Sequence, residues 1–224
     1  MIHLKKQILF SFLFLCFVSF AQKTTSFVGM IEFQIEAHDS TLIDFLPNHP
    51  MIIYTNDTIT RTENYTDQLG KQVEIHHMGL NKSYILLDTP RGKFAIQNNL
   101  NDQTRDTVPS EYTFKKKWFK KKILGKKANR VMVNHPSFKE PIEFLYFKNI
   151  SSRYNAIFDE IPGLLVRYSI VTIDGVLDYE MVRFNEYVPA HDLFGIPAEF
   201  KRISFSDFVE IMTSPDNHQM ISPE

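Results

Sequence analysis

Short segments in which apolar and polar residues alternate follow one another along most of this chain, and turn-forming residues separate them. Residues 27–37 are the clearest case, because Ile31, Phe33 and Ile35 alternate with glutamate and glutamine. A period of two is typical of a strand with one buried face. Further strands are expected at 50–55, 58–64, 72–78, 83–88, 93–98, 128–133, 141–148, 164–172 and 177–187.

The connections between these segments are short and carry residues that favour chain reversal. Asp174-Gly175 between Ile173 and Val176 is a strong hairpin signal. The strands follow one another without regular intervening helices, which argues against βαβ units. The sequence therefore predicts a mainly β (α+β) fold built as a meander of short strands.

Few segments have helical periodicity. A helix is expected at 205–212, where apolar residues recur at helical spacing, and Ser204 with Asp207 resembles a capping box. Shorter helical turns are expected at 39–46 and 154–158. Such helices are long enough only to cover part of a sheet.

The N-terminus has the pattern of a secretory signal peptide. Lys5 and Lys6 precede an apolar run from Ile8 to Phe20, and the small residues Ser19 and Ala21 mark a cleavage site before Gln22. The alternative is an uncleaved anchor, but the run is shorter than the roughly 20 residues of a spanning helix. The expected organisation is a signal peptide at 1–22, a single β-rich domain at 23–212 and a flexible polar tail at 213–224.

Export fixes several properties of the mature chain. Cys16 is the one cysteine and lies inside the apolar run without the small residues that precede a lipidated cysteine, so the mature protein is expected to lack disulfides. Removing two lysines leaves 23 basic against 26 acidic residues, a net charge of −3. Nucleic acid is therefore not an expected partner.

A lysine run in the middle of the chain is the candidate binding feature. If it forms a strand, Lys115, Lys117, Phe119 and Lys121 share one face and Trp118 lies among lysines on the other. One interpretation is a contact for anionic lipid headgroups or an acidic partner. The other is a solvated edge strand that lysine protects from aggregation. The candidate anionic-partner patch consists of Lys115, Lys116, Lys117, Trp118, Lys120, Lys121 and Lys122, and Lys126 and Lys127 extend it.

No segment of the sequence carries a known catalytic motif. There is no Gly-x-Ser-x-Gly elbow, no His-Glu-x-x-His and no phosphate-binding glycine loop. His76 and His77 are adjacent, so on a strand they point to opposite faces and one metal cannot take both. We therefore expect a protein that is not an enzyme, with no catalytic residues, no cofactor and no metal.

Six short motifs follow one another along the chain: Gly29-Met-Ile-Glu-Phe33, Lys121-Lys-Ile-Leu-Gly125, Ala128-Asn-Arg-Val131, Glu143-Phe-Leu-Tyr146, Ile161-Pro-Gly-Leu-Leu165 and Phe194-Gly-Ile-Pro197. Taken in this order, they resemble the GLPGLI family of exported Bacteroidetes proteins. In the namesake motif, Glu160-Ile161 replace the family's Gly-Leu and Leu165 replaces its last isoleucine. That family has no assigned activity.

The family's pattern in turn resembles the LolA/LolB-type half-barrel, which implies a curved antiparallel sheet or half-open barrel with one or two short covering helices. The concave face of such a sheet holds lipid acyl chains. Two functions follow as expectations. The first is an exported, non-enzymatic periplasmic or envelope protein that binds an apolar ligand such as lipid on the concave face, unless those apolar residues simply fill a core. The alternative is a structural or interaction protein of the outer envelope that uses the Lys115–Lys127 patch.

Overall fold

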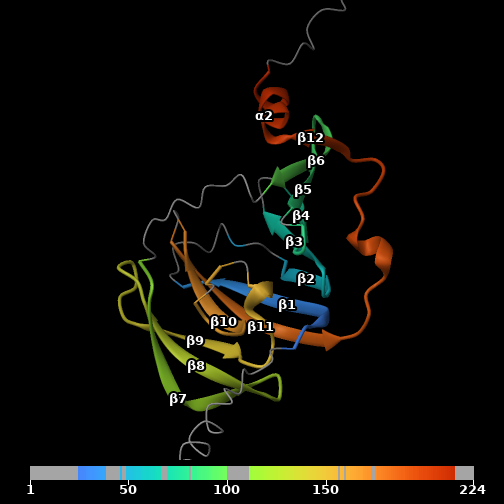
Figure 1. Ribbon diagram of the computed structural model, residues 1–224. Helices are drawn as coiled ribbons and strands as arrows, with labels where there is room; N and C mark the ends of the chain where they lie inside the picture. Colours follow the sequence, from blue (N-terminus) through green and yellow to red (C-terminus); the bar gives the residue numbers. More distant parts are fainter. Residues whose placement is uncertain are drawn as a thin grey trace, which may run out of the picture.

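Twelve strands form one open, curved sheet that is not closed into a barrel (Figure 1). The computed structural model describes residues 25–38, 46, 49–66, 70–80, 82–99, 111–155, 157–158, 160–172 and 175–214. The strands are β1 (Val28–Ala37), β2 (Met51–Asn56), β3 (Ile59–Thr66), β4 (Gly70–His77), β5 (Lys82–Thr89), β6 (Gly92–Asn99), β7 (Thr113–Ile123), β8 (Lys126–Asn134), β9 (Ile142–Phe147), β10 (Leu164–Val171), β11 (Val176–Glu186) and β12 (Lys201–Ser204). The helical elements are the 3₁₀ turns η2 (Ser152–Tyr154) and η3 (His191–Phe194) and the helix α2 (Phe205–Thr213).

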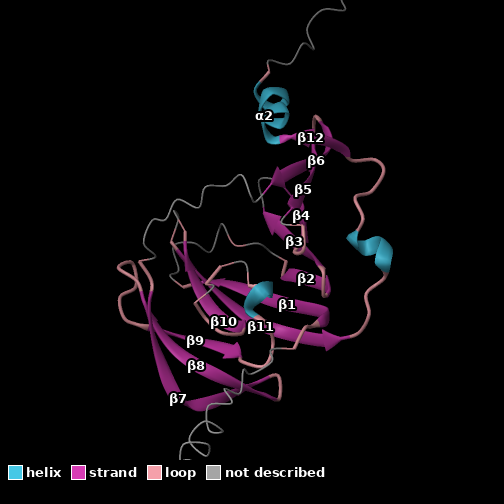
Figure 2. Cartoon of the chain, in the orientation of Figure 1, coloured by secondary structure: helices cyan, strands magenta, loops and turns pink. Residues whose placement is uncertain are grey.

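The first strand of the chain lies in the middle of the sheet. Across the sheet the order is β12-β6-β5-β4-β3-β2-β1-β11-β10-β9-β8-β7, so two meanders extend from β1 in opposite directions. Neighbouring strands are antiparallel except for β6 and β12, which pair in parallel. Figure 2 shows how strongly strands dominate the described chain. The predicted mainly β, antiparallel fold is thus confirmed, with one parallel pair at an edge.

Aromatic side chains fill the core beside strands β8 to β11. The connection between β9 and β10 contributes Phe158, whose ring centroid lies 5.3 Å from that of Phe144 and 4.9 Å from that of Tyr112. Tyr154 and Ile161 of the same connection are also buried. This connection therefore covers one face of the sheet with its own side chains.

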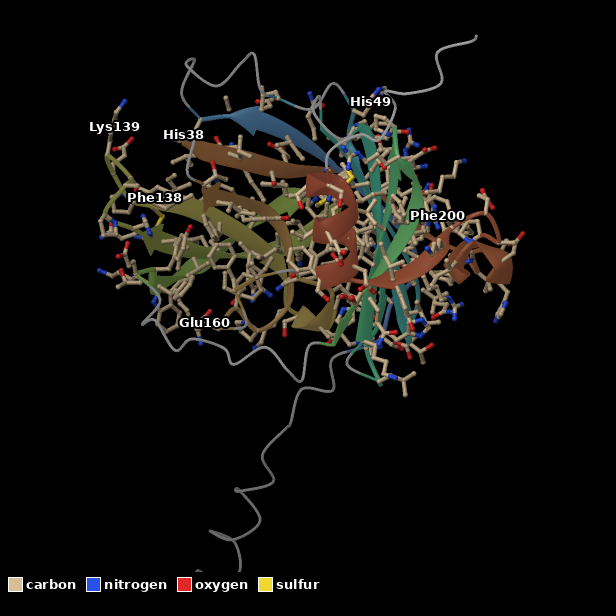
Figure 3. The ribbon with its side chains drawn as sticks, turned by 90° about the horizontal axis from the view of Figure 1, so that it is seen from above. His38, His49, Phe138, Lys139, Glu160 and Phe200 are labelled. Carbon is tan, nitrogen blue, oxygen red and sulfur yellow. The ribbon has the colours of Figure 1, made fainter. Side chains whose placement is uncertain are left out.

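The C-terminal part of the chain packs on both faces of the sheet at its β4 to β6 end. On one face, Ile196 and Phe200 pack against buried residues of β4, β5 and β6. On the other face, Phe208 of α2 packs against Phe94, with ring centroids 5.8 Å apart. Figure 3 labels Phe200 at the opposite end of the molecule from Phe138, which lies in the connection that follows β8. The expected helix at 205–212 is confirmed, including the capping box of Ser204.

The expected helix at 154–158 is wrong. The chain instead forms η2 and then becomes extended at Asn155, whose side chain donates to the carbonyl of Gly163 and accepts from the amide of Leu165. Phe158 adopts a φ of +68°, which a helix cannot accommodate. The Asn155 bridge fixes the connection to the start of β10, and this tertiary contact outweighs local helical propensity.

Two further elements were not predicted. β12 has four residues, and η3 is a single turn before it. The hairpin predicted at Asp174-Gly175 is confirmed by the antiparallel pairing of Val171 with Val176.

Several expectations fall outside the described residues. They are the signal peptide at 1–22 and the helical turn over 39–45, together with residues 215–224 of the expected tail. Within the described residues, no helix has both the length and the apolar character needed to cross a bilayer.

Candidate functional site

The predicted patch lies on β7, which is the last strand of the sheet (Figure 1). β7 pairs with β8 along one edge, and no other described strand pairs with its second edge. All six lysines of the strand and both of its central aromatic residues are exposed. We call the following set the β7 surface: Lys115, Lys116, Lys117, Trp118, Phe119, Lys120, Lys121 and Lys122.

A bulge interrupts the pairing of β7 with β8 at the two aromatic residues in the middle of the strand. Lys117 pairs with Arg130 and Lys121 with Ala128, so three residues of β7 stand opposite the single residue Asn129 of β8. Such an excess interrupts the ladder and redirects side chains. Trp118 is 97% exposed and Phe119 is 80% exposed. The pairing of β7 with β8 is therefore interrupted at its centre, and both neighbouring rings are exposed to solvent.

Phe119 is a member of this surface that the sequence-based patch omitted. Alternation places it on the opposite face from Trp118, and both side chains are exposed. One signal was present in the sequence, because Trp-Phe is flanked by three lysines on each side. A pattern centred on the pair would have included both aromatic residues.

Two glutamates form ion pairs with basic residues of the β7–β8 hairpin. Glu143 on β9 forms ion pairs with Lys121 and Arg130, and the Arg130 Nε atom lies 2.6 Å from Glu143 Oε1. Near the turn, Lys126 Nζ lies 3.0 Å from Glu186 Oε1 and 4.8 Å from the ring centroid of Phe184. The other lysines of the β7 surface form no ion pair with a described residue, so their charge is available to a partner.

The ion pairs of Glu143 predict how the stability of the fold depends on pH. Burial alone would raise the pKa of Glu143, but hydrogen bonds from Lys121 and Arg130 outweigh it and hold the pKa below its ordinary value of 4.5. A carboxylate with a lowered folded pKa stabilises the fold above the unfolded value, and this contribution is lost as the pH falls through the folded value. Below pH 4.5, the wild type should therefore lose stability more steeply than Glu143→Gln, as measured by urea unfolding between pH 7 and 3.

The matched control for that experiment is Glu140→Gln, because Glu140 is exposed and forms no ion pair with a described residue. Its pH profile should follow that of the wild type. Equal slopes for the wild type and Glu143→Gln would show that the ion pairs at Glu143 do not stabilise the fold.

The expected apolar ligand site is less open than the sequence implied. Tyr154, Phe158 and Ile161 occupy the face of the sheet beside β8 to β10. A pocket of about 250 Å³ lies elsewhere, where the chain enters β1, and half-buried Phe184 and exposed Glu186 contribute to it. Its lining residues are Thr25, Ser26, Phe27, Val28, Ile150, Phe184 and Glu186.

The histidines do not gather into a site. In the part of the chain that the structure describes, no group of three or more His, Cys, Asp or Glu side chains is placed to hold a metal. His76 on β4 lies opposite Ser83 on β5, but neither His76 Nε2 nor Ser83 Oγ has a hydrogen-bond partner. A serine nucleophile needs a hydrogen-bonded base, so this arrangement does not activate Ser83.

Comparisons with known proteins give little further information. No protein-family model matches the chain, and no curated protein matches it. A solved structure of PNGF-II in space group C2 is similar over 82% of this chain, with a TM-score of 0.47 and 16% identity. A structure of PNGF-II in space group P2₁ gives a TM-score of 0.46 and 17% identity over 81% of this chain. The chain spans about a third (32%) of the length of PNGF-II, and a similarity of this size assigns neither an activity nor a ligand to it.

Proposed function

We propose that this protein is an exported, non-enzymatic interaction protein of the cell envelope whose β7 surface binds an anionic partner. The observation that carries the proposal is the exposure of Trp118 (97%) and Phe119 (80%) at the centre of six lysines. Membership of the GLPGLI family and cleavage of residues 1–22 belong to the same proposal, and they rest on the sequence.

The rival interpretation of β7 is a lysine-rich edge that only prevents aggregation. Lysines alone serve that purpose, because charge on an edge strand opposes pairing with another chain. Two adjacent exposed aromatic rings work against it, since they add apolar surface at the same edge. The exposure of Trp118 and Phe119 therefore favours a binding role.

An apolar ligand held by the sheet has weaker support. The face beside β8 to β10 already carries Phe158 and Tyr154, so a ligand there would have to displace buried side chains. Burying a phenylalanine contributes roughly 1.5–3 kcal/mol, which makes such displacement unfavourable. Binding by the β7 surface requires no such rearrangement.

The proposal predicts electrostatic binding to a soluble polyanion. Dextran sulfate at low ionic strength serves as the probe, and affinity is measured by titration of the mature protein. Replacing Lys116, Lys117 and Lys120 by glutamine should weaken binding about 100-fold, because a lysine near an anionic surface contributes about 1 kcal/mol and each 1.4 kcal/mol is tenfold. Raising the salt concentration should have the same effect.

The matched control removes three positive charges elsewhere. Lys82, Lys148 and Lys201 are exposed and lie outside the β7 surface, so their replacement by glutamine gives the same net charge. The control variant should bind as the wild type does. If both triple variants lose equal affinity, or if the wild type does not bind, the β7 surface is not the binding site.

A further inference from the structure

We infer that the partner of the β7 surface is an anionic lipid bilayer, with Trp118 and Phe119 inserted at the level of the headgroups and the lysines in contact with phosphates. This inference rests on the proposed function and names the chemistry of its partner. It follows from the apolar and charged side chains exposed along β7, which is the last strand at one edge of the sheet (Figure 1).

The β7 surface has a narrow apolar centre within a broad positive array. From Lys115 to Lys122 the strand extends on the order of 20 Å, given a rise of about 3.3 Å per residue. Three lysines precede the aromatic pair and three follow it, and all are exposed. This places positive charge on both sides of the two rings along the strand.

These proportions do not fit a protein partner. Two aromatic side chains bury roughly 150–250 Å² each, whereas a stable protein interface buries about 800 Å² on each partner. The centres of protein interfaces are also depleted in lysine. The remaining area of the β7 surface would come from lysine side chains, which retain their hydration and contribute little to such an interface.

The same proportions suit the surface of a bilayer. Tryptophan concentrates at the boundary between water and lipid, where its ring and its N–H group meet different environments. Lysine keeps its charge among the headgroups while its methylene chain covers apolar surface. Each lysine near an anionic leaflet contributes about 1 kcal/mol, so an exposed cluster gives usable affinity without a deep apolar face.

Ion pairs connect the β7–β8 hairpin to β9 and β11. Glu143 holds Lys121 and Arg130, and Glu186 and the Phe184 ring hold Lys126. The hairpin that carries the aromatic pair is therefore attached to the rest of the sheet by side-chain contacts as well as by the pairing of β8 with β9.

A second copy of the chain does not fit this edge. Antiparallel pairing of two β7 strands would place lysines opposite lysines, and like charges directly opposite destabilise a sheet. β7 carries no acidic residue that could offset this repulsion. The charge of the strand therefore selects an anionic partner.

The chain carries its own reporter for the test, because Trp118 is the single tryptophan of the sequence. The mature protein is titrated with vesicles of phosphatidylglycerol and, separately, of phosphatidylcholine, while tryptophan emission and acrylamide quenching are followed. With phosphatidylglycerol we expect a blue shift, at least a twofold loss of quenching and co-sedimentation with the vesicles. With phosphatidylcholine we expect none of these changes.

Two variants separate insertion from electrostatic attraction. Trp118→Ser should fold as the wild type does, because its side chain is almost fully exposed. It should bind phosphatidylglycerol vesicles at least tenfold more weakly, with a smaller loss of affinity for dextran sulfate. Replacing Lys116, Lys117 and Lys120 by glutamine should weaken both interactions about 100-fold. The Lys82, Lys148 and Lys201 control should retain both.

Three other outcomes would overturn the bilayer inference. Binding to dextran sulfate without binding to phosphatidylglycerol vesicles overturns the bilayer inference and leaves the proposed function standing. Vesicle binding with an unchanged emission spectrum also overturns it, because the aromatic pair then stays in water. Binding to neither probe overturns both.

Discussion

Replacing Phe144 by alanine is expected to lower the free energy of unfolding by about 3–5 kcal/mol, the usual range for removing a buried phenylalanine ring. Phe144 is fully buried on β9, and its ring lies 5.3 Å from Phe158 and 6.4 Å from Tyr168 between centroids. The cavity cannot close easily, because the neighbouring rings are attached to separate parts of the chain. Urea unfolding should show the loss as a lower midpoint, and thermal unfolding as a decrease of roughly 6–20 °C.

Phe119→Ala removes the same atoms from a surface position and is the matched control. Phe119 is 80% exposed, so its replacement should change the free energy of unfolding by less than about 0.5 kcal/mol. Equal effects at the two positions would mean that the ring of Phe144 does not form part of a packed core.

The substitution Gly29→Ala is expected to prevent β1 from pairing normally with β11. A Cβ atom at this position would lie 2.0 Å from the Asn185 carbonyl oxygen and 2.8 Å from the Phe27 ring, and the backbone φ is +153°. Moving a backbone carbonyl in the centre of a sheet breaks ladder hydrogen bonds. We expect a loss of about 3 kcal/mol or more, or an insoluble product, as measured by soluble yield and by urea unfolding.

Gly125→Ala provides the comparison for the backbone contribution. Gly125 also has a positive φ, +74°, but no heavy atom lies within 4 Å of an added Cβ. The expected cost is therefore only about 1–2 kcal/mol, from the left-handed conformation alone. If Gly29→Ala costs no more than Gly125→Ala, the close approach of β1 and β11 is not a constraint on this sheet.

Much of the sheet was predictable because burial of one face imposes alternation on the sequence. β2 is an example, since buried and half-buried residues alternate along Met51–Asn56. The elements that were missed have partners far away in the sequence. β12 is four residues long and is defined by pairing with β6, and η2 is placed by the contacts of Asn155 with Gly163 and Leu165. The local sequence pattern does not show which distant segment a strand or turn will contact.

The candidate site was predictable in composition and not in geometry. The lysine run identified β7 as a charged segment, and its position at an edge of the sheet agrees with the edge-strand interpretation. The bulge opposite Asn129 depends on the register between two strands, which alternation within one strand cannot reveal. Alternation within β7 assigns Trp118 and Phe119 to opposite faces, and both side chains are exposed.

The central position of β1 has a consequence for how the protein reaches this structure. Gly29 pairs with Glu186, so the two meanders are joined by contacts between the beginning and the end of the chain. Topologies with such a high contact order fold slowly, because a large loop must close before the contacts form. Until β11 is synthesised, one side of β1 remains an unpaired template for other chains, which makes the nascent protein a natural client of holding chaperones.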